Sequence, residues 1–269
     1  MNPLISYPFQ YKRASSVADA VQMLGDGGKA LSGGHSLIPT MKLRLNAPDV
    51  LVDVGRLPEL KGIAIDGDEL IIGAGATHGA IASSDLVKKH LPMFATGASQ
   101  IGDPSVRNRG TIGGSIAHAD PSADWPAMVI AADATIVMQG PSGTRRIKAE
   151  QFFTGLFSTA MHENELITQI RVPLHDGAKM TYQKFSQPAS RYAIVGCAIV
   201  KSADGSLRVA FSGVSEAPFR DKNAEAQLSS GQTAEAAAGM SILSDHYASE
   251  EYRKHLANVY LSRALAAVV

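Results

Sequence analysis

Two short glycine-rich segments hold the residues best suited to chemistry. The first, residues 32–39, reads SGGHSLIP, and the second, residues 111–115, reads TIGGS. Glycine lets the backbone approach a ligand closely and adopt positive φ. Successive N–H groups in such a turn form a concave anion site, and neighbouring serine and threonine hydroxyls add donors. One Gly-Gly pair is usually a tight turn, but two pairs with adjacent donors predict a pyrophosphate held between two loops.

The standard motifs for phosphate binding and nucleophilic catalysis do not match. Residues 25–30 (GDGGKA) have the wrong spacing and ending for a P-loop, and residues 73–78 (GAGATH) lack the last glycine of the dinucleotide fingerprint. Residues 34–38 (GHSLI) lack the closing glycine of a nucleophile elbow. The sequence thus excludes a recognisable P-loop protein, Rossmann enzyme or α/β-hydrolase.

Alternating strand and helix patterns are expected to position the first segment. Ser16 and Asp19 resemble a capping pair for a helix that Gly25 ends. Strands over residues 29–31 and 51–54 flank the glycine segment, and the spacing predicts a small parallel unit.

Patterns around the second segment predict a different arrangement. Two hairpins are expected, one across residues 62–73 around an Asp-Gly turn and one across residues 135–148. Helices are expected over residues 77–90, 91–101 and 123–132, and a strand over residues 166–172.

A polar stretch containing Gly177 predicts a domain boundary at residues 174–179. We expect domains at 1–175, with subdomains of about 1–56 and 57–175, and at 178–269. The second domain is predicted to contain strands over residues 181–185, 193–200 and 207–214 and helices over residues 224–228, 233–243 and 249–268. The fold class expected is α+β.

The amino-acid composition excludes several classes of function. The chain has 269 residues, with 25 Lys and Arg against 25 Asp and Glu, so it lacks the basic footprint of a nucleic-acid binder. Its single cysteine, Cys197, excludes a disulfide framework, a cysteine-type zinc finger and a self-ligated iron–sulfur cluster. The longest apolar stretch, residues 127–138, is too short to span a bilayer and is broken by Asp133. We therefore expect a cytoplasmic protein without a membrane span.

The chain resembles the medium, FAD-binding subunits of the molybdenum hydroxylases, the family of carbon monoxide dehydrogenase and xanthine dehydrogenase. Three ordered signatures carry the resemblance: SGGHSLIP with MKLR (32–44), RGTIGGS with ADPSAD (109–124), and YQKF with SRYAIVG (182–196). This resemblance implies the two-subdomain FAD-binding fold of the vanillyl-alcohol oxidase (PCMH) type, followed by a C-terminal α+β domain with a small antiparallel sheet and helices.

The resemblance also implies the residues that bind FAD. The pyrophosphate is expected between the two glycine segments, Asp124 beside the sugar or ribityl hydroxyls, and Lys184, Tyr192 and Ile167 around the flavin ring. An N-cap role for Asp124 and core packing for Tyr192 remain alternatives. The expected cofactor-binding residues are Ser32, Gly33, Gly34, His35, Ser36, Leu37, Thr111, Ile112, Gly113, Gly114, Ser115, His118, Asp124, Ile167, Lys184 and Tyr192.

Several other residues have less specific expectations. His78 follows a glycine-rich turn and is a candidate helix cap, while Trp125 is expected in the core or at the wall of the cofactor site. Arg107 and Arg109 precede the second glycine segment, where either FAD phosphate or a partner subunit is a possible contact. We expect no metal site and no catalytic acid, base or nucleophile, because a flavin carries its own redox chemistry.

The single cysteine means that the other cofactors of this family require other chains. The resemblance implies [2Fe–2S] clusters on a small iron–sulfur subunit and molybdopterin on a large subunit, in a dimer of heterotrimers. Electrons would enter FAD from the iron–sulfur chain and leave to NAD, a quinone or oxygen. The alternatives are a self-contained FAD oxidoreductase of the same fold and a scaffold subunit without flavin.

Overall fold

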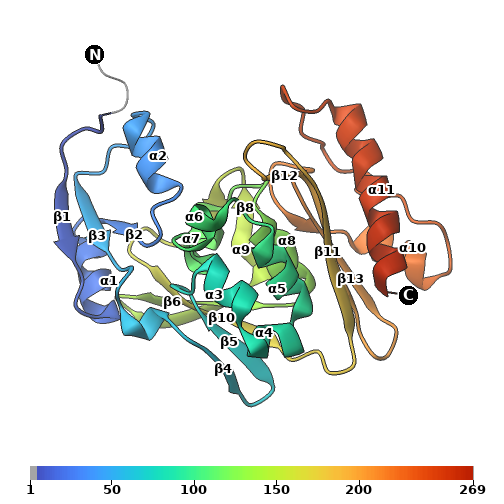
Figure 1. Ribbon diagram of the computed structural model, residues 1–269, viewed down its shortest axis with the longest axis horizontal. Coiled ribbons are helices and arrows are strands. Elements are labelled where there is room, and N and C mark those ends of the chain that lie inside the picture. The colour runs from blue at the N-terminus through green and yellow to red at the C-terminus, as the bar shows by residue number, and fades with distance from the viewer. Residues whose placement is uncertain (1–4, 269) are drawn as a thin grey trace.

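The computed structural model describes residues 5–268. From one end of the molecule to the other, Figure 1 shows a small N-terminal unit, a central unit of helices and a sheet, and a C-terminal sheet covered by a long helix. Each unit has its own cluster of buried apolar side chains.

The N-terminal unit is a three-stranded parallel sheet with two helices. Its strands β1 (Gln10–Arg13), β3 (Val50–Asp53) and β2 (Lys29–Leu31) pair in that order. Helix α1 (Val17–Gly25) and helix α2 (Leu37–Lys42) lie between strands in the chain. The expected parallel unit is confirmed, although β1 was not predicted.

Local hydrogen bonds explain where α1 begins. The Ser16 hydroxyl accepts from the Asp19 N–H, and the Asp19 carboxylate accepts from the N–H and hydroxyl of Ser15. This reciprocal arrangement satisfies donors at the helix start. The helix ends at Gly25, as expected.

The central unit is built on a five-stranded antiparallel sheet. The strands follow the order β4 (Ile63–Asp66), β5 (Glu69–Gly73), β10 (Leu166–Pro173), β6 (Thr135–Gly140) and β7 (Gly143–Lys148). Both expected hairpins are present. Short additional elements are the 3₁₀ turn η1 (Pro58–Leu60), α9 (Ala149–Phe152) and the pair β8 (Phe153–Gly155) and β9 (Ser158–Thr159).

Helices join the strands of this sheet and carry the second glycine segment. They are α3 (His78–Ser83), α4 (Asp85–His90), α5 (Pro92–Ser99), α6 (Pro104–Arg107), α7 (Ile112–His118) and α8 (Asp124–Ala131). The single helix expected over residues 77–90 is wrong. Ser84 takes an extended conformation, ends α3 and caps α4 with its hydroxyl, because serine competes with the helical backbone for hydrogen bonds.

The C-terminal unit is a four-stranded antiparallel sheet in the order β11 (Lys179–Ser186), β12 (Ala193–Lys201), β13 (Leu207–Ser212) and β14 (Phe219–Arg220). Helix α11 (Glu250–Val268) packs on β11 and β12, while α5 and α8 contact the sheet from the central unit (Figure 1). Eight consecutive residues of β12 are buried, since cover on both faces permits a continuous apolar strand.

A helix is confirmed at α10 (Lys222–Ser229), but the helix expected over residues 233–243 is wrong. Ala237 and Gly239 both take left-handed φ values, +55° and +76°, which no α-helix accommodates. The N–H groups of Ala236 and Ala237 instead donate to the side chains of Asn258 and Asp221. Tertiary contacts therefore override the local helix propensity.

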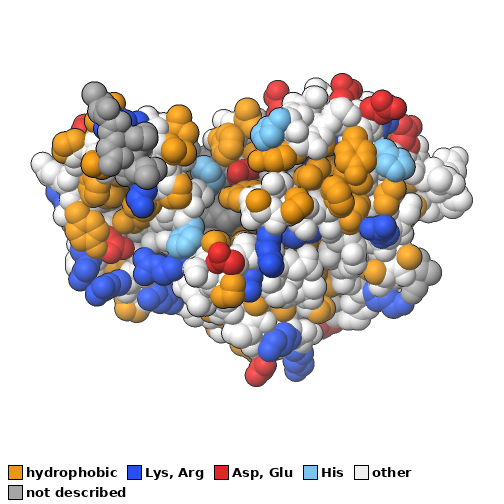
Figure 2. Space-filling model, turned by 45° about the horizontal axis from the view of Figure 1, so that its top comes forward, with side chains coloured by type: hydrophobic (Ala, Val, Ile, Leu, Met, Phe, Trp, Pro, Cys, Tyr) orange, Lys and Arg blue, Asp and Glu red, His pale blue; other side chains and the backbone are white. Residues whose placement is uncertain are grey.

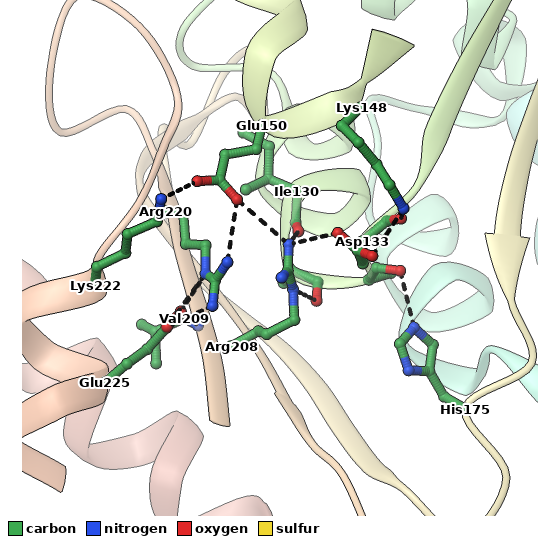
Figure 3. A network of polar contacts seen from close by, with 12 residues as sticks. Ile130, Asp133, Lys148, Glu150, His175, Arg208, Val209, Arg220, Lys222 and Glu225 are labelled. Carbon is green, nitrogen blue, oxygen red and sulfur yellow. Dashed lines mark hydrogen bonds and ion pairs between the residues drawn. The ribbon is translucent and has the colours of Figure 1, made fainter. Parts of the chain in front are cut away.

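Charged residues join the central and C-terminal units (Figure 3). Arg208 of β13 donates to the carbonyls of Ile130 and Ala131 at the end of α8, and it lies 3.0 Å from the Asp133 carboxylate. Arg220 bridges Glu225 and Glu150. Because charge-assisted hydrogen bonds are directional, these contacts fix the C-terminal sheet against α8.

Candidate functional site

A cavity of about 920 Å³ lies where the N-terminal and central units meet, with the β11–β12 turn at its edge. Figure 2 shows the molecular surface hollowed between the smaller part at the left and the larger part at the right. All but two of the expected cofactor residues line the cavity: Ser32, Gly33, Gly34, His35, Ser36, Leu37, Thr111, Gly113, Gly114, Ser115, His118, Asp124, Ile167 and Tyr192. The two exceptions are Ile112 and Lys184.

The first glycine loop presents a row of backbone donors. Among residues 5–268, no acceptor receives the N–H groups of Gly33, Gly34, His35 or Ser36. Gly34 has φ +74°, and a Cβ on Gly33 would clash with the Arg109 carbonyl. Glycine is therefore required at both positions, for the turn and for the close approach of two chain segments. Unpartnered N–H groups on a cavity wall are suited to an anion.

The backbone N–H groups of residues 112–115 in the second glycine loop already donate to acceptors within the protein. Thr111 caps α7 by accepting from the Gly114 N–H at 3.2 Å, and the Gly113 N–H donates to the Ala74 carbonyl. The Thr111 hydroxyl also lies 3.1 Å from that of Ser32, which ties the two loops together. A Cβ on Gly114 would meet only the Thr111 hydroxyl, at 2.8 Å. This loop thus offers hydroxyls and a flat backbone surface.

Ile112 lies away from the cavity. Its side chain is fully buried in the central core, and its N–H donates to the Ala76 carbonyl. It anchors α7 beneath the loop, so any contribution to binding is indirect. Ile167, on β10, does reach the cavity wall.

Asp124 lies at the centre of a buried polar cluster. One carboxylate oxygen accepts from the Tyr182 hydroxyl at 2.5 Å and the other from the Lys184 ammonium at 2.9 Å. Burial raises the pKa of Asp124, which the positive charge of Lys184 opposes. The alternative N-cap role is wrong, because Ala123 is the N-cap of α8 and Asp124 lies in the first turn. A carboxylate accepts more than two hydrogen bonds, so Asp124 retains capacity toward the cavity.

Tyr192 projects from the β11–β12 turn, with 41 % of its surface exposed, so simple core packing does not describe it. Burial of its hydroxyl raises the pKa of Tyr192 to about 12, and an interaction with Ser36 acts in the opposite direction. The ring is therefore directed from the turn toward the first glycine loop.

His78 lines the cavity. The expectation that it caps a helix is wrong. The cap of α3 is Thr77; the imidazole of His78 is 4 % exposed and accepts from the Trp125 indole N–H at 3.0 Å. Burial lowers the pKa of His78 to about 4, with positive charge on His35 and Arg107 adding to the effect. Trp125 is buried against Phe94 and His78, so it is a core residue.

Phe157 and Leu45 also line the cavity, although no sequence motif indicated either of them. Phe157, in the β8–β9 turn, has φ +50° and its ring lies 5.2 Å from that of His118. Burial lowers the pKa of His118 and raises that of Asp120. Leu45 also lines the cavity and is 76 % exposed. Only the tertiary structure brings these segments to one wall.

Residues 5–268 contain neither a candidate metal site nor a candidate membrane span. They contain no cluster of His, Cys, Asp and Glu with the geometry of a metal site. Their helices include none with the length and hydropathy needed to span a membrane. Arg107 donates to the carbonyls of Ile101 and Gly102, and Arg109 is exposed.

Comparison with known proteins gives consistent matches over the whole described chain. Residues 7–175 match the family described as "FAD binding domain in molybdopterin dehydrogenase", and residues 180–268 match "CO dehydrogenase flavoprotein C-terminal domain". The chain is 37 % identical to the glyceraldehyde dehydrogenase medium chain of Sulfolobus acidocaldarius, covering 97 % of this chain and 99 % of that one. It is 41 % identical to the carbon monoxide dehydrogenase medium chain of Hydrogenophaga pseudoflava over 82 % of this chain and 79 % of that one.

A solved structure agrees with the sequence matches. Carbon monoxide dehydrogenase from Hydrogenophaga pseudoflava, in a form lacking the Mo-pyranopterin moiety, superimposes with a TM-score of 0.92 and 38 % identity, covering 98 % of both chains. The expected FAD-binding fold with its C-terminal domain is thereby confirmed. Two matching domains in the expected order, together with a cavity walled by both glycine segments, establish that this chain belongs to the family of FAD-binding medium subunits of molybdenum hydroxylases.

Proposed function

We propose that the cavity holds FAD with its pyrophosphate against the first glycine loop. The observation that carries this proposal is the run of four N–H groups, from Gly33 to Ser36, that have no acceptor within the described residues 5–268. Thr111 and Ser115, which carry hydroxyls, line the same cavity from the second loop. An anion with many acceptor oxygens satisfies both sets of donors, whereas an apolar ligand leaves the N–H groups desolvated and unpaired.

The remaining cavity residues are assigned by their chemistry. Asp124 accepts from ribityl or ribose hydroxyls, while Tyr192 and Ile167 provide an aromatic and an apolar surface for the flavin ring. Lys184 is reassigned, since its ammonium does not line the cavity. FAD, when bound, supplies the electron-accepting and electron-donating chemistry, and the chain supplies binding, orientation and exclusion of water.

We further propose that this chain is the electron exit of a larger complex. Cys197 is fully buried in β12, and burial raises the pKa of its thiol, so it is a structural residue. [2Fe–2S] clusters on a small subunit would deliver electrons, and a large molybdopterin subunit would oxidise the substrate. NAD, a quinone or oxygen would be the final acceptor, and the assembly would be a dimer of heterotrimers. Two relatives of this chain are named for different substrates, carbon monoxide and glyceraldehyde.

The test is the visible absorption spectrum of the full chain mixed with FAD and passed through a desalting column, with released cofactor identified by chromatography. We expect stoichiometric FAD, and FMN should not be retained because it lacks the pyrophosphate and adenosine. A folded chain that retains neither contradicts the proposal and favours the scaffold alternative.

Co-purification from the native source distinguishes a subunit of a larger complex from a self-contained FAD oxidoreductase. Two further chains carrying iron–sulfur clusters and molybdopterin are expected. A flavin-loaded chain that purifies alone and turns over substrate would instead be a self-contained oxidoreductase.

A further inference from the structure

Lys184 is the one expected flavin contact whose charged group is fully engaged elsewhere. Its ammonium donates to the Asp124 carboxylate at 2.9 Å, to the Arg191 carbonyl at 2.8 Å and to the Gln100 carbonyl at 3.2 Å. An ammonium has three donors, and three acceptors occupy them. With its side chain 4 % exposed, Lys184 presents no N–H to the cavity.

One of these acceptors belongs to a strained turn. Arg191 has φ +62°, a left-handed conformation that L-residues other than glycine rarely adopt. The turn is closed locally by the Arg191 N–H donating to Gln187 and the Gln187 N–H donating to the Tyr192 carbonyl. The bond from Lys184 ties this turn to Gln100 and Asp124 of the central unit.

The two peptide groups flanking Tyr192 are therefore both held by the central unit. The Arg191 carbonyl before it is held by Lys184, which is paired with Asp124. The Ala193 N–H after it donates to the Ser122 carbonyl at 3.0 Å. Ser122 and Asp124 belong to the same segment that follows the second glycine loop. With both flanking groups fixed, the direction of the Tyr192 side chain is set.

We propose that Lys184 is a positioning residue: it ties the Arg191 carbonyl to Asp124 and thereby holds Tyr192 at the cavity, without touching the ligand. The ligand-related part rests on the proposed FAD site, whereas the tie itself does not. Removing the tie should release the turn and leave the strands around it paired.

Limited proteolysis tests the tie without any cofactor. Trypsin cleaves after Arg191, whose side chain is exposed and whose carbonyl is the group that Lys184 holds. In the full chain, Lys184→Met should accelerate cleavage of the Arg191–Tyr192 bond about tenfold, because cleavage follows the population of the opened turn and a charge-assisted bond is lost. Mass spectrometry identifies the product.

Matched variants keep the test specific. Lys148 also donates to a carboxylate, at 2.8 Å, and to a carbonyl, both of Asp133, which follows the C-terminal end of α8. Lys148→Met should leave cleavage at Arg191 unchanged. Lys184→Arg keeps N–H donors for the Asp124 carboxylate and the Arg191 carbonyl, so this variant should be cleaved as slowly as the native chain. Should Lys184→Met fail to fold, Lys184→Gln retains an N–H beside Asp124 and should also accelerate cleavage. If Lys184→Met or Lys184→Gln folds and is still cleaved at the native rate, the proposal is overturned.

FAD titration of the same proteins tests the link to the ligand. Lys184→Met and Tyr192→Ala should each raise the dissociation constant about tenfold, and the double variant should be no weaker than the weaker single variant, because both remove the same contact. If Lys184→Met is cleaved faster but binds FAD with unchanged affinity, the link between the Lys184 tie and FAD binding is wrong. Absence of FAD binding by the native chain overturns the proposed function and leaves the proteolysis result standing.

Discussion

Two residues at the cavity have roles that can be tested singly: Gly114 through the space beside it, and His78 through its protonation state. Gly114 faces open cavity, and the closest atom to an added Cβ is the Thr111 hydroxyl. His78 accepts from Trp125, which requires an unprotonated Nδ1. Each role gives a prediction that a single substitution or a change of pH tests.

Gly114→Val should abolish FAD retention, because the side chain occupies space that the phosphate needs. The free energy of unfolding should fall by about 1–2 kcal/mol, since the added Cβ lies 2.8 Å from the Thr111 hydroxyl that caps α7. Gly25→Val is the control: no atom lies within 4 Å of its added Cβ, and Gly25 ends α1. Full FAD content in Gly114→Val would contradict the pyrophosphate assignment.

The pKa of His78 gives the chain a defined loss of stability in acid. Its folded pKa of about 4 lies below its ordinary value of 6.5. The unfolded chain therefore binds more protons between these values, and the free energy of unfolding falls as the pH falls through this range. Above pH 6.5, unprotonated His78 contributes roughly 3 kcal/mol to the free energy of unfolding, and this contribution is lost as the pH falls to about 4.

Urea unfolding at pH 7.5 and pH 5, followed by fluorescence of the sole tryptophan, Trp125, measures this effect. His78→Gln should reduce the difference between the two pH values, whereas a change at the exposed His246 should not. An equal pH dependence in all three proteins would rule out His78 as its source.

At the scale of elements, helix caps connect local stability to the site. Thr111 and Thr77 cap α7 and α3 with bonds of equal length, 3.2 Å, but only Thr111 also contacts Ser32 and lines the cavity. Thr111→Val and Thr77→Val should each lower the free energy of unfolding by about 1 kcal/mol. Only Thr111→Val should also weaken FAD binding. Equal FAD affinities would show that the link between loops has no part in binding.

At the scale of the whole molecule, Arg253 connects the C-terminal helix to the cavity. Its buried guanidinium, on α11, donates to the carbonyls of Ile194 and Gly213 and pairs with Asp245. The neighbouring N–H groups of Ala193 and Gly213 donate to Ser122 and Pro121, beside Asp124. Helix α11, at the opposite end of the molecule from β2 and α2 in Figure 1, therefore supports a wall of the cavity.

Arg253→Met should destabilise the chain by about 2–4 kcal/mol, because two buried carbonyls lose their donor. It should also weaken FAD binding through the 121–124 segment. Arg263→Met, on the same helix but placed over the Tyr260 ring, is the control and should do neither. Thermal melts with and without FAD measure both effects.

The sequence by itself determined the local features of this protein. The loop from Gly33 to Ser36, the capping pair at Ser16 and both hairpins follow from turn and cap chemistry, which operates within a few residues. The ordered glycine signatures also identified the family, since such loops tolerate few alternatives.

Tertiary structure alone decided the contacts between distant segments. The absence of a helix over residues 233–243 and the pairing of Lys184 with Asp124 depend on groups up to 60 residues apart. Side-chain partners at such separations leave no local pattern, because a buried charge is satisfied by whichever opposite charge the fold brings to it. The resemblance implied that Lys184 lies beside a flavin ring, but its ammonium pairs with Asp124 and does not line the cavity.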